Sequence, residues 1–584
     1  MKALLLAAAL VLRAAAQPPL PEFAVRTSDG RIHSYTAPDR AAASSRFSDR
    51  LVEAEVRCEA DGLYLLELRA VSALAAVYFP WESQAEWLDD PGDDVVYLPR
   101  LQGVAIDAQR ADSDDWDGFL YPGELISPLV ILGDGQRARM LAAANWPPRT
   151  ARPRVGVGRF AIEYPEALGV GAAVRCAALV LRATGDATKG EEAWRLTADA
   201  YVKWLDGRMA AAGMPEPYYP PALRDAHGWQ QVLLHFLPAF DADDLRSAYE
   251  RRRDVLPWVQ FWGQMSNYQR DPAEGRDGTP SPPLVFGERT GCCVDEPELH
   301  PRYRPGLPRL AQQIVADGGV VGFYQRPRSP YGRLDGGVGN PDVGFLLNWV
   351  DTNRRNGANA FYLDVVGAKH FGEALAVADL LRAHAPPLSV TERTVDVYPA
   401  AALISGALWG GPRFRTRPGQ TPADFSETFA RCTFPRLGRT LLPERPMFLG
   451  GANGDFMYWG DFRGHECWTE RQAFLLGAKF DAPTRFKGQP GWVDPVTRGV
   501  AAAIAARERV GWWQRGPRYR DREGLSEVPD GVQVRRFVDE AGVTLLAVDN
   551  WTRRAGLEFR YRGRPIPVPE ESLSVLELPR ALEP

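Results

Sequence analysis

A repeating alternation of short apolar runs and helical stretches constrains the fold more than any other feature. From about Gly228 it recurs every thirty to forty residues or so, which is typical of parallel strand-helix-strand units. Eight such units over about 250 residues match the size of a (β/α)₈ TIM barrel. The eight predicted strands are 231–236, 256–263, 320–324, 360–363, 388–391, 402–406, 447–450 and 478–480.

The flanking regions have a different pattern. Before the barrel, short polar-apolar alternation broken by Gly, Pro and Asp predicts an antiparallel β-sandwich, followed by a linker helix over 190–209. After it, a helix over 497–513 precedes short alternating strands. The predicted fold class is therefore multidomain α/β and all-β. Its parts are a signal peptide (1–16), an N-terminal sandwich with linker helix (17–220), a barrel (221–495), and a helix with a small C-terminal β domain (496–584).

The first sixteen residues indicate export. Lys2, an apolar run and small residues up to Ala16 match a signal peptide, so we expect a secreted or periplasmic protein. Later apolar runs are too short or interrupted to cross a bilayer, which predicts no membrane insertion. The formal net charge of −5 gives no support for nucleic-acid binding. Nothing in the sequence sets the oligomeric state.

The six cysteines lack the paired spacing of a zinc site. Adjacent Cys292 and Cys293 could form a strained bridge, although free thiols are the simpler interpretation. With seven histidines and no HxH pair at a strand end, we expect no catalytic metal and no cofactor. Loop oxygens of Asp295, Glu296 and Glu298 remain a candidate structural Ca²⁺ site.

Two predicted barrel strands each end on a carboxylate. The run FYLD ends on Asp364, and SVTE, one strand-helix unit later, ends on Glu392. The C-terminal ends of barrel strands carry catalytic residues, and adjacent strands lie about 4.8 Å apart. Two acids at equivalent strand ends can therefore face each other across one sugar-sized site, as glycosidic bond hydrolysis requires.

Aromatic and polar residues gather at the same predicted strand ends. A pyranose stacks its C–H face on an aromatic ring while its hydroxyls bond polar groups. Singly, each Trp is more often core, Lys369 is more often solvated, and Asp481 is more often a helix cap. The predicted substrate-binding residues are Trp258, Trp262, Tyr324, Lys369, His370, Arg393, Trp409 and Asp481.

The FYLD and SVTE strands, set between a sandwich and a small β domain, resemble retaining α-glycoside hydrolases. The chain resembles endo-α-N-acetylgalactosaminidases and, more distantly, α-galactosidases. It also looks like a family of uncharacterised secreted bacterial proteins with a glycosidase-like barrel. The resemblance implies that Asp364 is the nucleophile. It places the acid/base on the fifth or sixth strand, where Glu392 is present and LISGALWGG offers no carboxylate.

The residues themselves agree with that implication. Asp364 is short and fixed, which suits a nucleophile, whereas the longer Glu392 can reach the leaving oxygen and keep its proton beside Asp364. The predicted activity is a retaining glycosidase acting on α-linked galactose-type or N-acetylgalactosamine-type oligosaccharides or polysaccharides. Two alternatives remain: an inactive carbohydrate-binding protein on a glycosidase scaffold, and an unrelated metal-dependent barrel hydrolase.

Overall fold

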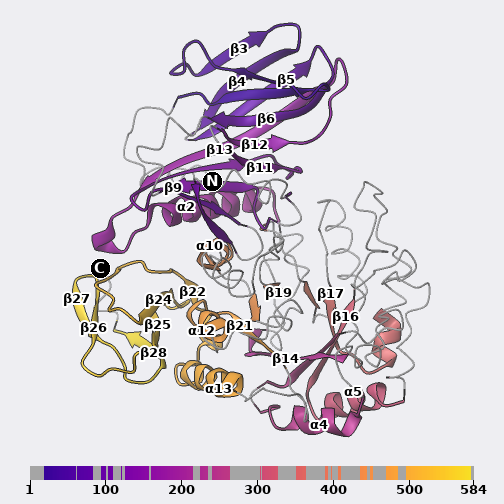
Figure 1. Ribbon diagram of the computed structural model, residues 1–584, viewed down its shortest axis with the longest axis vertical. Coiled ribbons are helices and arrows are strands. Elements are labelled where there is room, and N and C mark those ends of the chain that lie inside the picture. Colours follow the sequence, from indigo (N-terminus) through magenta and orange to yellow (C-terminus); the bar gives the residue numbers. More distant parts are fainter. Residues whose placement is uncertain are drawn as a thin grey trace, which may run out of the picture. The chain divides into compact units, whose positions relative to one another are not determined.

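The computed structural model describes most of the chain (Figure 1). The described residues are 19–262 (without 61, 83–93, 100–102, 109–119, 122–124, 157–158, 215–223, 235–239 and 255), 303–325 (without 304), 350–363, 389–391, 396, 406–409, 435–443, 447–450, 468–483 and 495–579. The chain divides into two compact units: residues 1–187 with 191–204, and residues 188–190 with 205–584. The division falls inside one helix, and the predicted boundaries at 220 and 495 stay predictions.

The first unit contains two antiparallel sheets. The five-stranded sheet runs in the order β11 (Arg152–Gly156), β12 (Arg159–Tyr164), β6 (Leu74–Glu82), β1 (Glu22–Thr27), β2 (Ile32–Tyr35). The eight-stranded sheet runs β3 (Ser44–Ser48), β4 (Val52–Ala60), β5 (Leu63–Ala70), β13 (Ala173–Thr184), β10 (Arg137–Ala143), β9 (Leu129–Gly133), β7 (Val95–Leu98), β8 (Val104–Asp107).

Aromatic side chains join the two sheets. Phe23 of β1 stacks on Tyr35 with ring centroids 4.5 Å apart and meets Phe47 of β3 edge-on at 5.1 Å. The alternation of buried and exposed residues along β4 is the pattern of a sheet with one face in a core. The antiparallel sandwich strands predicted for this region are therefore present.

The linker helix is also present. Helix α2 (Ala193–Ala211) follows the 3₁₀ turn η3 (Ala187–Lys189) and buries Trp194 and Tyr201. Trp194 stacks on Tyr97 of β7 at 5.6 Å, which joins the start of α2 to the eight-stranded sheet of the first unit.

Eight parallel strands in the second unit close into a barrel, each paired in register with its neighbours. Connections between most of them lie outside the described residues, so the structure shows the strand wall and only part of the helical layer. The strands are β14 (Gly228–Leu233), β15 (Trp258–Trp262), β16 (Val320–Gln325), β17 (Ala360–Leu363), β18 (Ser389–Thr391), β19 (Gly406–Trp409), β20 (Met447–Gly450) and β21 (Lys479–Pro483).

All eight predicted barrel strands have a counterpart, and the largest corrections concern three of the predicted ranges. Strand β14 begins three residues earlier than predicted, at Gly228, where a side chain would lie within 2.0 Å of the Phe480 carbonyl oxygen. Strand β19 starts at Gly406, where the predicted strand ended. The prediction was wrong because AALISGALW contains two apolar runs that are equally suitable as a strand. Strand β21 continues to Pro483, which places Asp481 within the strand.

Apolar side chains on the outer face of the wall pack against helices α4 (Ala242–Glu250) and α5 (Leu307–Ala316). Val259, Phe261, Phe323 and Phe361 join Leu245 and other residues of these helices in one buried cluster. The Asp241 carboxylate caps α4 by accepting from the backbone N–H groups of Asp243 and Asp244. This cluster fixes which face of each strand is turned away from the barrel interior.

Helices and two small sheets complete the second unit. The helices are α10 (Pro435–Leu441), α12 (Trp468–Leu475) and α13 (Pro495–Glu508), followed by the 3₁₀ turn η7 (Trp513–Arg515). One sheet has the order β22 (Arg518–Tyr519), β24 (Val532–Val538), β25 (Thr544–Asn550), β28 (Leu573–Leu578), and the other β23 (Leu525–Ser526), β26 (Glu558–Tyr561), β27 (Arg564–Pro567). Leu546 and Phe559 share one core between them.

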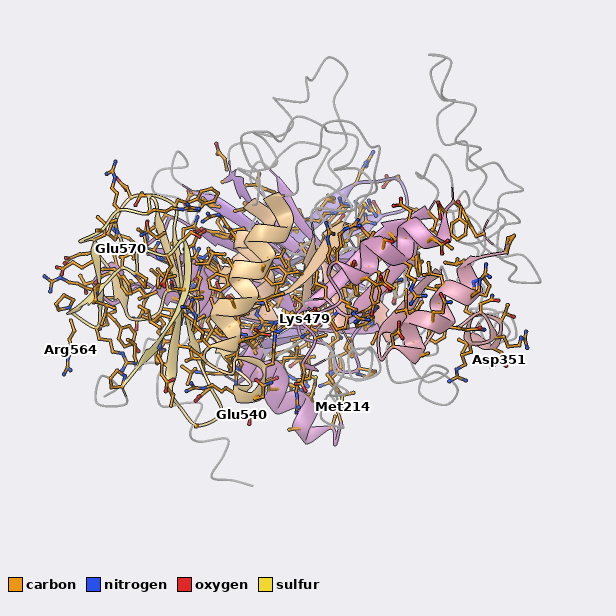
Figure 2. The ribbon with its side chains drawn as sticks, turned by 90° about the horizontal axis from the view of Figure 1, so that it is seen from below. Met214, Asp351, Lys479, Glu540, Arg564 and Glu570 are labelled. Atoms are coloured by element: carbon orange, nitrogen blue, oxygen red, sulfur yellow. The ribbon has the colours of Figure 1, made fainter. Side chains whose placement is uncertain are left out.

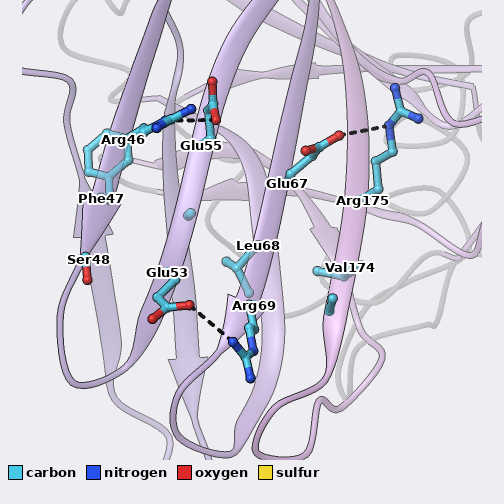
Figure 3. Close-up of a pocket in the computed structure, with 12 residues that line it drawn as sticks. Arg46, Phe47, Ser48, Glu53, Glu55, Glu67, Leu68, Arg69, Val174 and Arg175 are labelled. Carbon is cyan, nitrogen blue, oxygen red and sulfur yellow. Dashed lines mark hydrogen bonds and ion pairs between the residues drawn. The ribbon is translucent and has the colours of Figure 1, made fainter.

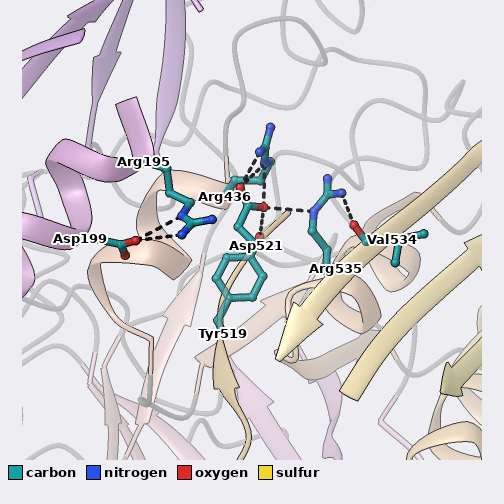
Figure 4. A network of polar contacts seen from close by, with 7 residues as sticks. All are labelled: Arg195, Asp199, Arg436, Tyr519, Asp521, Val534 and Arg535. Carbon is teal, nitrogen blue, oxygen red and sulfur yellow. Dashed lines mark hydrogen bonds and ion pairs between the residues drawn. The ribbon is translucent and has the colours of Figure 1, made fainter. Parts of the chain in front are cut away.

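A buried charge network fastens α10 to the C-terminal strands (Figure 4). Arg436 donates to both oxygens of Asp521, at 2.9 Å from its Nε to Oδ1, and the Tyr519 hydroxyl donates to the same carboxylate at 2.7 Å. Arg535 lies 3.4 Å from it and donates to the Val534 carbonyl. Burial opposes the charge on Asp521, but Arg436 and these hydrogen bonds hold its pKa below the usual range.

Among the described residues, no helix is long and apolar enough to cross a membrane. The predicted signal peptide lies outside the described residues, as do Cys292 and Cys293 and the loop with Asp295, Glu296 and Glu298. Cys58 and Cys176, which are described, are free thiols.

Candidate active site at the carboxyl ends of the barrel strands

Strands β17 and β18 lie side by side in parallel, and their last residues are register partners. Leu363 pairs with Thr391, just as Phe361 pairs with Ser389. In the sequence, Asp364 directly follows Leu363 and Glu392 directly follows Thr391. Both carboxylates lie outside the described residues. The described backbone nevertheless ends each strand one position before its acid, in matching register.

Three of the predicted aromatic residues occupy the same end of the barrel. Trp262 is the last residue of β15, Trp409 is the last residue of β19, and Tyr324 is the next to last of β16. Their backbone positions are described, and their side chains are not. Lys369, His370 and Arg393 lie outside the described residues.

Trp258 is placed differently from the sequence prediction. It is the first residue of β15, at the opposite end of the strand from Trp262, and its side chain is only 1% exposed. Its ring packs edge-on against Trp229 of β14 at 5.2 Å. A buried ring has no free face for a sugar, so Trp258 is a core residue. The predicted strand 256–263 already placed Trp258 near its amino-terminal end, and the prediction included it only because it belongs to the aromatic WVQFW run.

The strand position of Asp481 also needs correction. The prediction put it just beyond a strand that ended at Phe480, but the structure places it third in β21. Its register partners are Trp229, the second residue of β14, and Gly450, the last residue of β20. Its predicted contact with substrate stays a prediction, because its side chain lies outside the described residues.

The barrel interior contains side-chain amides that the sequence analysis did not single out. Gln231 and Gln260 are register partners and are at most 1% exposed. In the described part of the chain, neither amide has a hydrogen-bond partner. Gly322 is next in the same register, and a side chain there would lie 1.9 Å from the Gln260 Oε1 atom. The glutamines within the otherwise apolar strands β14 and β15 were the sequence signal that could have indicated these buried amides.

Basic side chains gather at the amino-terminal end of β21. Lys479 donates to the Arg224 carbonyl at 2.9 Å and to the Ala226 carbonyl, and its ammonium lies 3.7 Å from the centre of the Trp513 ring. Lys479 is 1% exposed, and Figure 2 labels it near the middle of the view. Burial, helped by the charge of Arg507, lowers the pKa of Lys479 well below its ordinary value.

His227 completes this basic cluster. Its Nδ1 accepts a hydrogen bond of 2.9 Å from the Trp513 indole, which leaves the proton on Nε2, 3.3 Å from a Glu508 oxygen. Burial, with the charges of Arg507 and Lys479, lowers the pKa of His227 to about 4. The cluster lies at the opposite end of β21 from the predicted site, so we assign it a structural role.

The first unit has a shallow groove of about 660 Å³ across β3, β4, β5 and β13 (Figure 3). Its charges are paired across the strands: Arg46 with Glu55 at 3.1 Å, Arg69 with Glu53 at 3.6 Å, and Arg175 with Glu67 at 3.7 Å. Ladders of exposed pairs contribute little energy and are typical of a solvated sheet face. This groove contains no pair of free carboxylates.

Within the described residues, no group of three or more His, Cys, Asp or Glu side chains could hold a metal ion. The candidate Ca²⁺ ligands Asp295, Glu296 and Glu298 lie outside them. The structure therefore does not test the expectation about metals.

The described part of the chain forms two compact units, and the second contains a closed parallel barrel with accompanying β sheets. No protein-family model matches the chain, and no curated protein matches it. Solved structures similar to it include an α-galactosidase from Thermus thermophilus in complex with p-nitrophenyl α-D-galactopyranoside. That match has 14% identity and a TM-score of 0.45, and it covers 90% of this chain and 99% of the other.

Two further similar structures come from other organisms. An α-galactosidase from Lactobacillus brevis has 10% identity and a TM-score of 0.43, covering 97% of this chain and 87% of its own. A xylosidase from Aspergillus niger has 11% identity and a TM-score of 0.44, covering 96% and 85%. At these low sequence identities and TM-scores, the function of this chain has to be inferred from its own residues.

Proposed function

We propose that this protein is a retaining glycoside hydrolase, with Asp364 as nucleophile and Glu392 as general acid/base. One observation carries the proposal. Strands β17 and β18 are adjacent, parallel and in register through Leu363 and Thr391, and the residue after each partner is a carboxylic acid. We expect the two acids to lie at equivalent positions on the carboxyl-terminal side of the barrel, where barrel enzymes carry their catalytic groups.

The spacing of the strands suits the retaining mechanism. Neighbouring strands are about 4.8 Å apart, and the two carboxyl groups of a retaining glycosidase are about 5 to 5.5 Å apart. In the first step, an Asp364 oxygen bonds to the anomeric carbon while Glu392 protonates the departing glycosidic oxygen. In the second, Glu392 removes a proton from water, which attacks the anomeric carbon and releases Asp364.

The aromatic residues supply the substrate class. Trp262, Tyr324 and Trp409 all lie in the last two positions of their strands, on the side where Asp364 and Glu392 follow theirs. Aromatic residues at the same strand ends as a carboxylate pair suit an oligosaccharide or polysaccharide substrate, because pyranose C–H faces stack on aromatic rings. We propose α-linked galactose or N-acetylgalactosamine as the first sugars to test, since the FYLD and SVTE strands resemble those of enzymes acting on these sugars.

A panel of α- and β-linked aryl glycosides tests the activity. Wild-type protein should release phenol from one α-galactosyl-type substrate, whereas Asp364→Asn should be inactive under the same conditions. Trp258→Phe is the matched control. Because the Trp258 ring is buried in the core, this substitution should change the stability of the fold without selectively removing activity. If no glycoside is cleaved while glycans still bind, the inactive carbohydrate-binding alternative is correct.

Metal removal gives a second test. Two carboxylates complete the proposed chemistry by themselves, so dialysis against EDTA should leave kcat unchanged. A structural Ca²⁺ would instead appear as a lower Tm after EDTA. Loss of activity that returns with Zn²⁺ would support a metal-dependent hydrolase. We also propose that the protein is exported to the periplasm or the medium. Mass spectrometry of the expressed protein tests this by showing whether the predicted signal peptide has been removed.

A further inference from the structure

Trp551 is an exposed aromatic residue held in a fixed position. It directly follows β25 and is 41% exposed, whereas Trp229, Trp258 and Trp512 are at most 1% exposed. Among the described residues, the other large hydrophobic side chains with high exposure are both valines, Val71 and Val170. An exposed indole offers an apolar surface on which the C–H face of a sugar can stack.

The ring is fixed from one side. The Arg471 guanidinium of α12 lies 3.8 Å from the centre of the Trp551 ring and forms an ion pair with Asp549. Burial raises the pKa of Asp549 to about 6, against the opposing effect of Arg471. Arg471 thus lies over one face of the Trp551 ring, and the residue still keeps 41% of its surface exposed.

The backbone around Trp551 is equally constrained. The Asn550 Oδ1 atom accepts from the Thr552 hydroxyl at 2.8 Å and from the Arg553 backbone N–H at 2.9 Å, and its Nδ2 donates to the Pro569 carbonyl at 2.9 Å. The Trp551 N–H donates to the Gly531 carbonyl at 3.0 Å. Binding would therefore require little ordering of this segment.

We propose that Trp551 forms a glycan-binding site distinct from the barrel, with its free face stacked on a pyranose ring. Arg553 and Arg554 are exposed on the same turn and supply N–H donors for sugar hydroxyls. The choice of a glycan as the ligand rests on the proposed function. Trp551 keeps its exposed surface because a bound sugar covers it, and a preorganised ring gives more affinity than a mobile one.

Fluorine NMR on protein labelled with 5-fluorotryptophan tests this site directly. Trp551→Phe removes one resonance and so assigns the Trp551 signal. The probes are α-linked galactosyl and N-acetylgalactosaminyl oligosaccharides of two to six sugars or so. Added glycan should shift the Trp551 signal, and Trp551→Ala should weaken binding at this site roughly tenfold. Arg564→Ala, on the exposed strand β27 of the same region, is the control and should retain wild-type binding.

The outcomes separate this site from the proposed function. If aryl glycosides are hydrolysed but the Trp551 signal does not shift with any oligosaccharide, the surface site is wrong and the catalytic proposal stands. A shift of the signal without hydrolysis supports the site and contradicts the catalytic proposal. A shift caused equally by nucleotides would show that the ring stacks any flat or apolar ligand, and the assignment to glycans would fail.

Discussion

Gly322 shows how one residue controls the barrel interior. A methyl group at this position would lie 1.9 Å from Gln260 Oε1 and 2.9 Å from Trp258 Nε1, and both side chains are buried. We predict that Gly322→Ala lowers the free energy of unfolding by about 2 kcal/mol through overpacking. Urea unfolding measures the change.

The double variant identifies the cause. Gly322→Ala should cost less stability when it is introduced into the Gln260→Ala variant than when it is introduced into wild type, because the side chain that it would clash with is gone. Gly228→Ala is the matched control: its side chain would lie 2.0 Å from a backbone oxygen of Phe480, which no substitution removes. Strict additivity of the two changes at Gly322 and Gln260 would contradict the proposed contact.

His227 predicts a pH dependence of stability. Burial, Arg507 and Lys479 lower its folded-state pKa to about 4, whereas an unfolded histidine takes its proton at about 6.5. The unfolded chain therefore binds more protons between these values. The stabilisation of about 3 kcal/mol is fully present above about pH 6.5 and is lost as the pH falls toward about 4.

His227→Asn tests this dependence. The amide oxygen can still accept from Trp513, but it does not titrate. In urea unfolding between pH 7 and pH 4.5, the variant should lose less stability than wild type. Equal pH profiles for the two proteins would show that the His227 proton has no part in it.

At the level of elements, the attachment of α10 to the C-terminal strands depends on Asp521. This carboxylate is 0% exposed, pairs with Arg436, and sits in the left-handed region with φ of 50°. Asp521→Ala should lower the free energy of unfolding by about 3 kcal/mol, because Arg436 then lies near Arg535 without its acid. Chemical denaturation gives the value.

An exposed ion pair in the same region serves as the control. Glu577 pairs with Arg515 at 2.7 Å, but its side chain is 51% exposed. Glu577→Ala should therefore cost less than about 1 kcal/mol. Similar losses for the two variants would show that burial does not determine the strength of these pairs.

The sequence predicted elements well where an apolar run had clear ends. Strands β17 and β20 have the predicted bounds, and β24 matches the VQVRRFV run. Prediction failed where apolar residues continued: AALISGALW allowed two strands, and KFDAP extended a strand through an acid. Trp258 was wrongly predicted as a site residue, although the predicted strand 256–263 placed it at the amino-terminal end, whereas barrel enzymes carry their sites at the carboxyl-terminal end.

At the scale of the whole molecule, counting the apolar runs in the sequence predicted the closed barrel. The side-chain contacts inside the barrel could not be predicted in this way. Strand number and alternation are local properties of the sequence. The register that pairs Gln231 with Gln260, and Leu363 with Thr391, appears only when the chain closes. The catalytic pair was proposed from the sequence because each acid ends a strand-like run, and it stays a prediction. The exposed Trp551 could not be found in this way, because exposure is a tertiary property.

The stereochemistry of azide rescue tests the central assignment most directly. With an activated aryl glycoside, Glu392→Ala plus azide should give a glycosyl azide of retained configuration, since azide attacks the intermediate on Asp364. Asp364→Ala plus azide should give the inverted product, since azide then replaces the nucleophile. NMR of the products reads both configurations. The same configuration from both variants, or no product from either, would contradict the roles of Asp364 and Glu392.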